Sequence, residues 1–200
     1  MDRCDGIRST AWGTILATEE TDTGQAYELI NPLATTNHTV TDRAVGAIVD
    51  SSGAVSTNIV KRDALPTISW EGLTVTADGV VIGGDELRPG DAGTNHDGGA
   101  IFKFVPQTSH AGGFIENLVD SPLAAGSTYA LQVQCKSGGG EGYGQGCEVG
   151  GGEWILVTAA NARSDTDTAG ATGYYRPEDL HADPTYAGPG LRFCWTNTGN

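Results

Sequence analysis

The chain has 200 residues, which is enough for one sizeable domain. Its net charge of −14 and only 11 lysines and arginines argue against a nucleic-acid partner, because affinity for phosphate backbones comes from clustered cations. No apolar run approaches the ~20 residues of a transmembrane helix, so we expect no membrane span. The 30 glycines and 8 prolines predict many turns and few long helices.

Short apolar runs, often β-branched, follow one another along the chain. Those predicted to be strands are 14–18, 26–30, 47–50, 54–60, 73–76, 80–83, 101–105, 128–134 and 153–158. Asp78-Gly79 predicts a hairpin, because this pair supports the positive φ of a tight turn. Only 159–169 fits a short helix. Closely spaced strands with turn signals between them favour an all-β sandwich, barrel or propeller.

Two glycine-rich segments, 87–99 and 136–152, are predicted to be loops. Cys135 and Cys147 bracket the second of them. A disulfide between these cysteines would close the loop and contribute roughly 3 kcal/mol to stability. The bridge would also imply an oxidising compartment, and we expect a secreted or periplasmic protein.

Acidic residues recur in four segments, each beside an apolar strand. The segments contain Glu19-Glu20, Glu71, Asp85-Glu86 and Glu178-Asp179, and Cys4 precedes the first of them. Carboxylates that converge from several strands would form an oxygen-rich site for a hard cation such as calcium. A thiolate beside them admits iron or zinc. The pattern predicts a metal site, whereas any one pair alone is more typical of a solvated turn.

The order of these and other motifs resembles the PhoX-type alkaline phosphatases of bacteria. The matching segments are Cys4-Asp5-Gly6, Trp12-Gly13-Thr14, Glu19-Glu20, Trp70-Glu71-Gly72, Gly84-Asp85-Glu86, 101–105, 126–130, Gly152-Glu153-Trp154, Arg176-Pro177-Glu178 and 196–200. The likeness is colinear over nearly the whole chain. Each motif alone is moderately specific, and their common order makes the resemblance strong.

The resemblance implies a β-propeller with calcium and iron in its central channel and an activity on phosphate monoesters. The metal ligands that it implies are Cys4, Glu19, Glu71, Asp85 or Glu86, and Glu178. It also implies a catalytic role for Arg176, which would hold the phosphate, and for Glu178, whose cation would face the phosphoryl group. An arginine fork suits this role because it pairs two phosphate oxygens. Clustered cations would neutralise the charge that develops on the transferring group.

Several features depart from the family pattern, among them Ala11 in place of proline and Glu86 in place of the usual aspartate. Trp70 stands where the family has histidine, and members of the family are longer, with a signal peptide ahead of the first motif. We therefore expect a fragment that covers the central and later motifs, as one domain of consecutive antiparallel blades in an incomplete propeller. The alternatives are a non-catalytic, calcium-stabilised extracellular propeller and a fibre or surface-layer subunit. Either form could self-associate through exposed strand edges.

Overall fold

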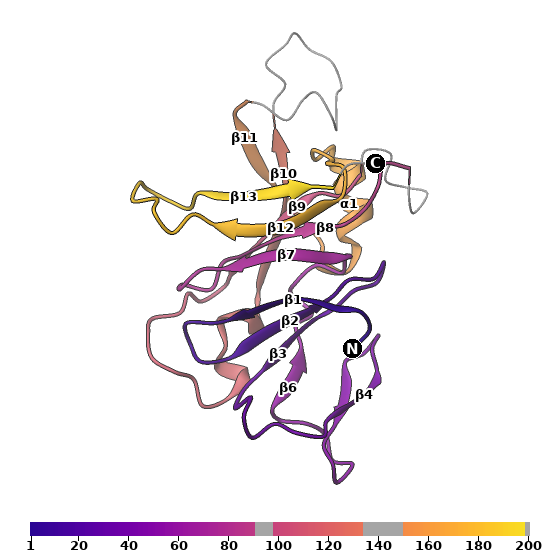
Figure 1. The fold of residues 1–200 in the computed structure, drawn as a ribbon, viewed down its shortest axis with the longest axis vertical. Coiled ribbons are helices and arrows are strands. Elements are labelled where there is room, and N and C mark those ends of the chain that lie inside the picture. The colour runs from indigo at the N-terminus through magenta and orange to yellow at the C-terminus, as the bar shows by residue number, and fades with distance from the viewer. Residues whose placement is uncertain (91–97, 134–149, 199–200) are drawn as a thin grey trace.

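The structure, a computed structural model, describes residues 1–90, 98–133 and 150–198. This part of the chain consists mainly of antiparallel strands with one short α-helix (Figure 1). The all-β expectation is therefore confirmed. The predicted disulfide between Cys135 and Cys147 lies outside the described residues, and within them Cys4 and Cys194 are free and exposed.

The first sheet is four-stranded and has the order β1-β2-β3-β6. Its strands are β1 (Cys4–Ser9), β2 (Ile15–Glu19), β3 (Ala26–Leu29) and β6 (Ile59–Lys61). A separate hairpin of β4 (Thr39–Asp42) and β5 (Ala47–Val49) is inserted between β3 and β6. The apolar run 54–60 forms a strand only at its end. The Ser56 hydroxyl accepts the backbone N–H groups of Asn58 and Ile59, and this turns the chain before β6.

The second sheet is five-stranded and runs β7-β8-β9-β10-β11 in chain order. Its strands are β7 (Trp70–Val75), β8 (Val81–Asp85), β9 (Ile101–Pro106), β10 (Gly126–Val133) and β11 (Gly152–Val157). The predicted hairpin at Asp78-Gly79 joins β7 to β8, and Gly79 has the positive φ of 100° that the turn requires.

Helical turns follow β9 and β11 of the second sheet. The 3-10 turns η1 (Leu118–Asp120) and η2 (Pro122–Ala124) come after β9, and η3 (Ala159–Asn161) leads into α1 (Ala162–Ala169). The helix predicted at 159–169 is confirmed, and it ends at Gly170 in the left-handed conformation. No helix in the described ranges is long and apolar enough to cross a membrane.

The last sheet consists of β12 (Pro177–Ala182) and β13 (Phe193–Asn197). Strand β7 packs against β1 on one side and against β12 on the other (Figure 1). Each of the sheets that start with β1, β7 and β12 thus begins with an inner strand, and these three inner strands lie next to one another. This is the arrangement of consecutive blades in an incomplete propeller, in which the first strands of the blades line the axis.

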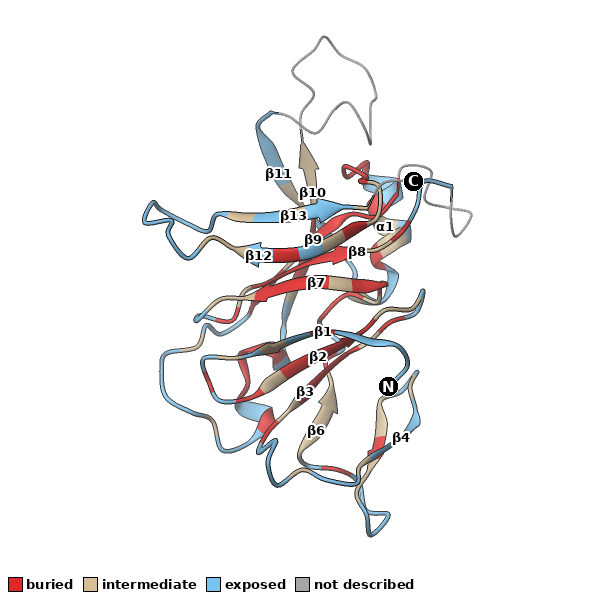
Figure 2. Cartoon of the chain, in the orientation of Figure 1, coloured by how far each residue is buried: buried red, intermediate tan, exposed pale blue. Residues whose placement is uncertain are grey.

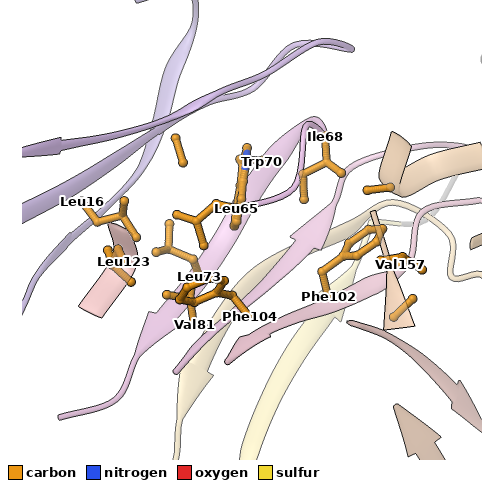
Figure 3. Packing of buried hydrophobic residues seen from close by; sticks show 14 of the residues in the cluster. Leu16, Leu65, Ile68, Trp70, Leu73, Val81, Phe102, Phe104, Leu123 and Val157 are labelled. Carbon is orange, nitrogen blue, oxygen red and sulfur yellow. The ribbon is translucent and has the colours of Figure 1, made fainter. Parts of the chain in front are cut away.

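The main hydrophobic core lies between the first two blades, as the buried segments in Figure 2 show. Leu16 of the first blade packs in one cluster with Trp70, Leu73 and Phe104 of the second (Figure 3). Trp70 is fully buried, and its indole N–H donates to the Pro66 carbonyl at 3.1 Å. A smaller cluster, centred on Ile82, Ile101, Tyr174 and Leu180, joins the second blade to the third.

Candidate metal centre

The starts of the inner strands share one backbone arrangement. Cys4 pairs with Glu19 in the first blade, and Trp70 pairs with Asp85 in the second. In both blades the register then shifts at a bulge before regular pairing resumes. In the third blade the irregularity falls just after Glu178. Bulges redirect the side chains beside them, so they set the direction of the acidic residues Asp5, Glu71 and Glu178.

A backbone hydrogen bond marks the same position in all three blades. The residue that follows the second strand donates its N–H to the residue that precedes the inner strand. The three bonds are Glu20 to Arg3 at 2.8 Å, Glu86 to Ser69 at 2.8 Å and Thr198 to Arg176 at 3.1 Å. The acidic residues therefore occupy equivalent places, and two blades add a second carboxylate, Glu20 or Glu86.

These five carboxylates form the acidic cluster, which consists of Asp5, Glu20, Glu71, Glu86 and Glu178. Oxygens of Asp5, Glu20 and Glu71 lie within 4.8 Å of one another. The Glu86 side chain lies close enough to Glu20 to accept a hydrogen bond from its protonated form. Glu178 lies 3.2 Å from Arg176, whose guanidinium also pairs with Glu86. The three inner blade starts thus bring their carboxylates to one place.

Mutual repulsion and partial burial affect the protonation of the cluster. Burial, with added repulsion from Asp5, Glu178, Glu86 and Glu20, raises the pKa of Glu71 to about 7. Burial likewise raises the pKa of Asp5, with repulsion from Asp179, Glu86 and Glu178 as further causes. For Glu20 the causes of a raised pKa are burial and then the side-chain hydrogen bond that its protonated form donates to Glu86. The local charge is therefore poorly compensated by the protein's own cations.

Two arginines flank the cluster. Arg3 contacts Glu20 with 2.7 Å between Nη2 and Oε1, and Arg176 pairs with Glu86 and Glu178. Both arginines directly precede an inner strand and have left-handed backbones, with φ of 46° and 51°. This conformation is costly for a non-glycine residue, so the surrounding structure must hold it in place. The carboxylates nevertheless outnumber these two guanidinium groups.

The donor atoms fit a hard cation. Calcium takes several carboxylate oxygens in a flexible geometry, and a divalent cation would relieve the repulsion that raises the pKa of Glu71. The Cys4 thiol lies beside Asp5 in the chain, and burial followed by repulsion from Asp5 raises its pKa. Use of this sulfur as an iron ligand would therefore require the metal itself to displace the proton.

The structure places the sequence-predicted residues in three kinds of surroundings. Glu71, Glu86, Glu178 and Arg176 come together in and around the acidic cluster. Glu19 and Asp85 are fully buried and ion-paired with arginines outside the cluster. Cys4 is the cross-strand partner of Glu19 and is exposed.

Asp5 and Glu20 lie in the sequence motifs, but the family resemblance does not imply them as ligands. Each lies directly next to a residue for which it does imply that role, Cys4 or Glu19. Successive side chains of a regular strand point to opposite faces, so a shift of one position changes the surroundings that a side chain meets. The bulge between Cys4 and Ile7 determines that Asp5, and not Cys4, points to the cluster. No local sequence signal marks the position of this bulge.

The fold and the acidic cluster define a class of protein: consecutive antiparallel propeller blades with carboxylates at the starts of their inner strands. Among solved structures, the chain is similar to Pseudomonas fluorescens PhoX in complex with vanadate, a transition state analogue, with a TM-score of 0.50 and 19% identity. The match covers 90% of this chain and 37% of that chain. The PhoX resemblance expected from the motifs is therefore confirmed at the level of the fold.

Comparisons at the sequence level add no further relative. No family model matches the chain, and no curated protein matches it significantly.

Proposed function

We propose that the chain carries the cation-binding part of a PhoX-like hydrolase of phosphate monoesters. The observation that carries this proposal is the convergence of five carboxylates from three blades beside Arg176. The fold supports it, because the similar solved structure holds vanadate, a transition state analogue. Vanadate, like phosphate, is an anion whose central atom is surrounded by oxygens, which suits a site made of cations and an arginine.

In this proposal Asp5, Glu20 and Glu71 hold a cation, and Glu86 and Glu178 complete the set. Calcium is the cation that the oxygen donors favour, and iron would enter with the Cys4 thiolate. A bound cation supplies positive charge for the oxygens of a transferring phosphoryl group. The guanidinium of Arg176 would bind further phosphate oxygens through two parallel hydrogen bonds. To do so, the phosphate must displace Glu86 and Glu178, which pair with Arg176 in this structure.

The proposed substrate is a small phosphate ester, and the proposed location is outside the cell or in the periplasm. Self-association through strand edges also stays a proposal. The third blade has only two strands in the described part of the chain, so β13 has a free edge there.

Two measurements test the function together. Metal analysis and calcium titration of the chain should detect a bound cation. The full-length protein should hydrolyse a chromogenic phosphate monoester at alkaline pH. We expect Arg176→Ala or Glu178→Ala to slow the hydrolysis roughly a hundredfold or more, because each removes charge stabilisation of a few kcal/mol. Arg192→Ala is the matched control, since Arg192 pairs with Asp183 away from the cluster.

A cation-stabilised propeller without catalysis is the second candidate. Trp70 favours this candidate, because it stands where the family has a histidine. Its side chain is packed in the core, and its indole N–H donates a hydrogen bond to the Pro66 carbonyl. An imidazole could have supported a ligand or the substrate. A protein that binds calcium but hydrolyses no phosphate ester would decide for this candidate.

A further inference from the structure

Two members of the acidic cluster directly follow a buried carboxylate that an arginine holds. Glu20 follows Glu19, which receives the Nε and Nη2 groups of Arg43 at 3.1 and 2.8 Å. Glu86 follows Asp85, which receives the Nε and Nη2 groups of Arg163 at 2.8 and 2.7 Å. Both carboxylates are fully buried. The two blades therefore repeat an arginine–carboxylate pair behind the cluster.

Each buried carboxylate also binds the backbone ahead of its inner strand. Glu19 accepts the N–H of Asp2 at 2.7 Å, and Asp85 accepts the N–H of Ser69 at 2.9 Å. The side chain thus joins the end of the second strand to the start of the first. These two ends carry the cluster residues of the blade, which are Asp5 with Glu20 and Glu71 with Glu86.

The arginines reach the site from distant parts of the chain. Arg43 lies between β4 and β5, and Arg163 lies on α1. Arg163 also donates to the Asp22 carbonyl at 2.9 Å, just beyond the end of β2. Arg163 therefore contacts the second blade at Asp85 and the first blade near Glu20. It connects the two blades that supply Asp5, Glu20 and Glu71, whose oxygens lie closest together.

We propose that the pairs Arg43–Glu19 and Arg163–Asp85 are positioning pairs that set the spacing of the cluster carboxylates and hence their affinity for a cation. Glu19 and Asp85 then act through Glu20 and Glu86 instead of binding the cation themselves. This inference rests on the proposed cation site. Ligand oxygens must lie within a few tenths of an ångström of their ideal distance, so loosened supports weaken binding ~10–100-fold.

The first blade offers a matched control pair. Arg62 and Glu28 are buried and contact each other at 2.6 Å, and Trp12, Thr14 and Ser121 also bind Glu28. Glu28 lies on β3 and does not belong to the cluster. Removal of Arg62 should cost stability, because it leaves the buried charge of Glu28 without its partner, and it should not change the cluster.

The test uses terbium as a luminescent substitute for calcium in the whole chain. Its affinity comes from titration, and the number of waters on the bound ion comes from the luminescence lifetime. We expect Arg163→Gln to weaken terbium binding at least tenfold and to change the number of bound waters. The control Arg62→Gln should lose stability in urea but keep both values. Arg163→Lys retains the charge without the fork and should restore the affinity in part.

The outcomes separate three cases. If Asp85 is itself a ligand, Arg163→Gln frees it, and terbium binding becomes stronger or stays unchanged, which overturns the inference. If Arg62→Gln weakens binding as much as Arg163→Gln does, the pairs serve only stability, and the inference is also wrong. The proposed function has its own test, because Glu71→Gln must weaken terbium binding whatever the arginine variants show. Should Arg163→Gln fail to fold, Arg43→Gln provides the same test on the pair whose arginine is partly exposed.

Discussion

At the residue scale, Glu71 is the carboxylate whose environment most strongly predicts a measurable effect. Its folded pKa of about 7 lies above the ordinary value of 4.5, so the protonated form stabilises the fold. Without a cation, the free energy of unfolding should therefore fall as pH rises from about 4.5 through 7. After allowance for solvent screening, we expect a loss of about 1 kcal/mol, measured by urea unfolding in chelator at pH 5 and pH 8.

The variant Glu71→Gln should remove this part of the pH dependence, because the amide carries no charge at either pH. The exposed Glu116, which lies outside the cluster, supplies the control Glu116→Gln. An equal fall in stability for wild type and Glu71→Gln would show that the repulsion in the cluster is not the cause.

At the scale of elements, close backbone contact holds the inner strands together. A Cβ atom on Gly72 of β7 would lie 2.0 Å from the backbone nitrogen of Leu180 on β12. Backbone cannot move aside as the end of a side chain can, so Gly72→Ala must push the two blades apart. We expect a loss of about 3 kcal/mol in urea unfolding and a weaker affinity for calcium.

Asp179 is the matched control for this change. In β12 it takes the position that Gly6 and Gly72 hold in the other two inner strands, directly after the cluster carboxylate, and it is exposed. Asp179→Ala should cause no loss of stability beyond about 0.5 kcal/mol, because the side chain is exposed and its removal relieves repulsion on Asp5. Equal losses for both variants would contradict the account of blade contact.

At the scale of the whole molecule, cation binding should act on global stability. The cluster draws ligands from all three blades, so a bound cation must resist their separation. We expect calcium to raise the Tm in a saturable manner, with about 2.7 kcal/mol of stabilisation at a calcium concentration one hundred times the Kd. Scanning calorimetry with calcium and with chelator measures this effect.

The double variant Asp5→Asn with Glu71→Gln should lose most of this calcium response while it keeps its fold. Magnesium supplies a second control, because it demands a smaller and more regular arrangement of ligands than calcium. A calcium response that survives in the double variant would place the cation elsewhere in the molecule.

The amino-acid sequence by itself determined the apolar strands of the second blade, the hairpin at Asp78-Gly79 and the short helix before Gly170. In these elements local patterns and packing agree, so alternation and turn residues are sufficient signals. The order of the acidic motifs also led to the PhoX-like fold. The polar strands β1, β12 and β13 were not predicted, because their exposed residues follow no apolar pattern.

Only the tertiary structure decided which member of each acidic pair meets the cluster. Glu20 and Glu86 face it, while Glu19 and Asp85 turn to arginines that are far away in the chain. Side chains alternate along a strand, and one bulge reverses which face a given residue takes. The position of such a bulge depends on how neighbouring blades pack, and this is set by contacts between residues distant in sequence.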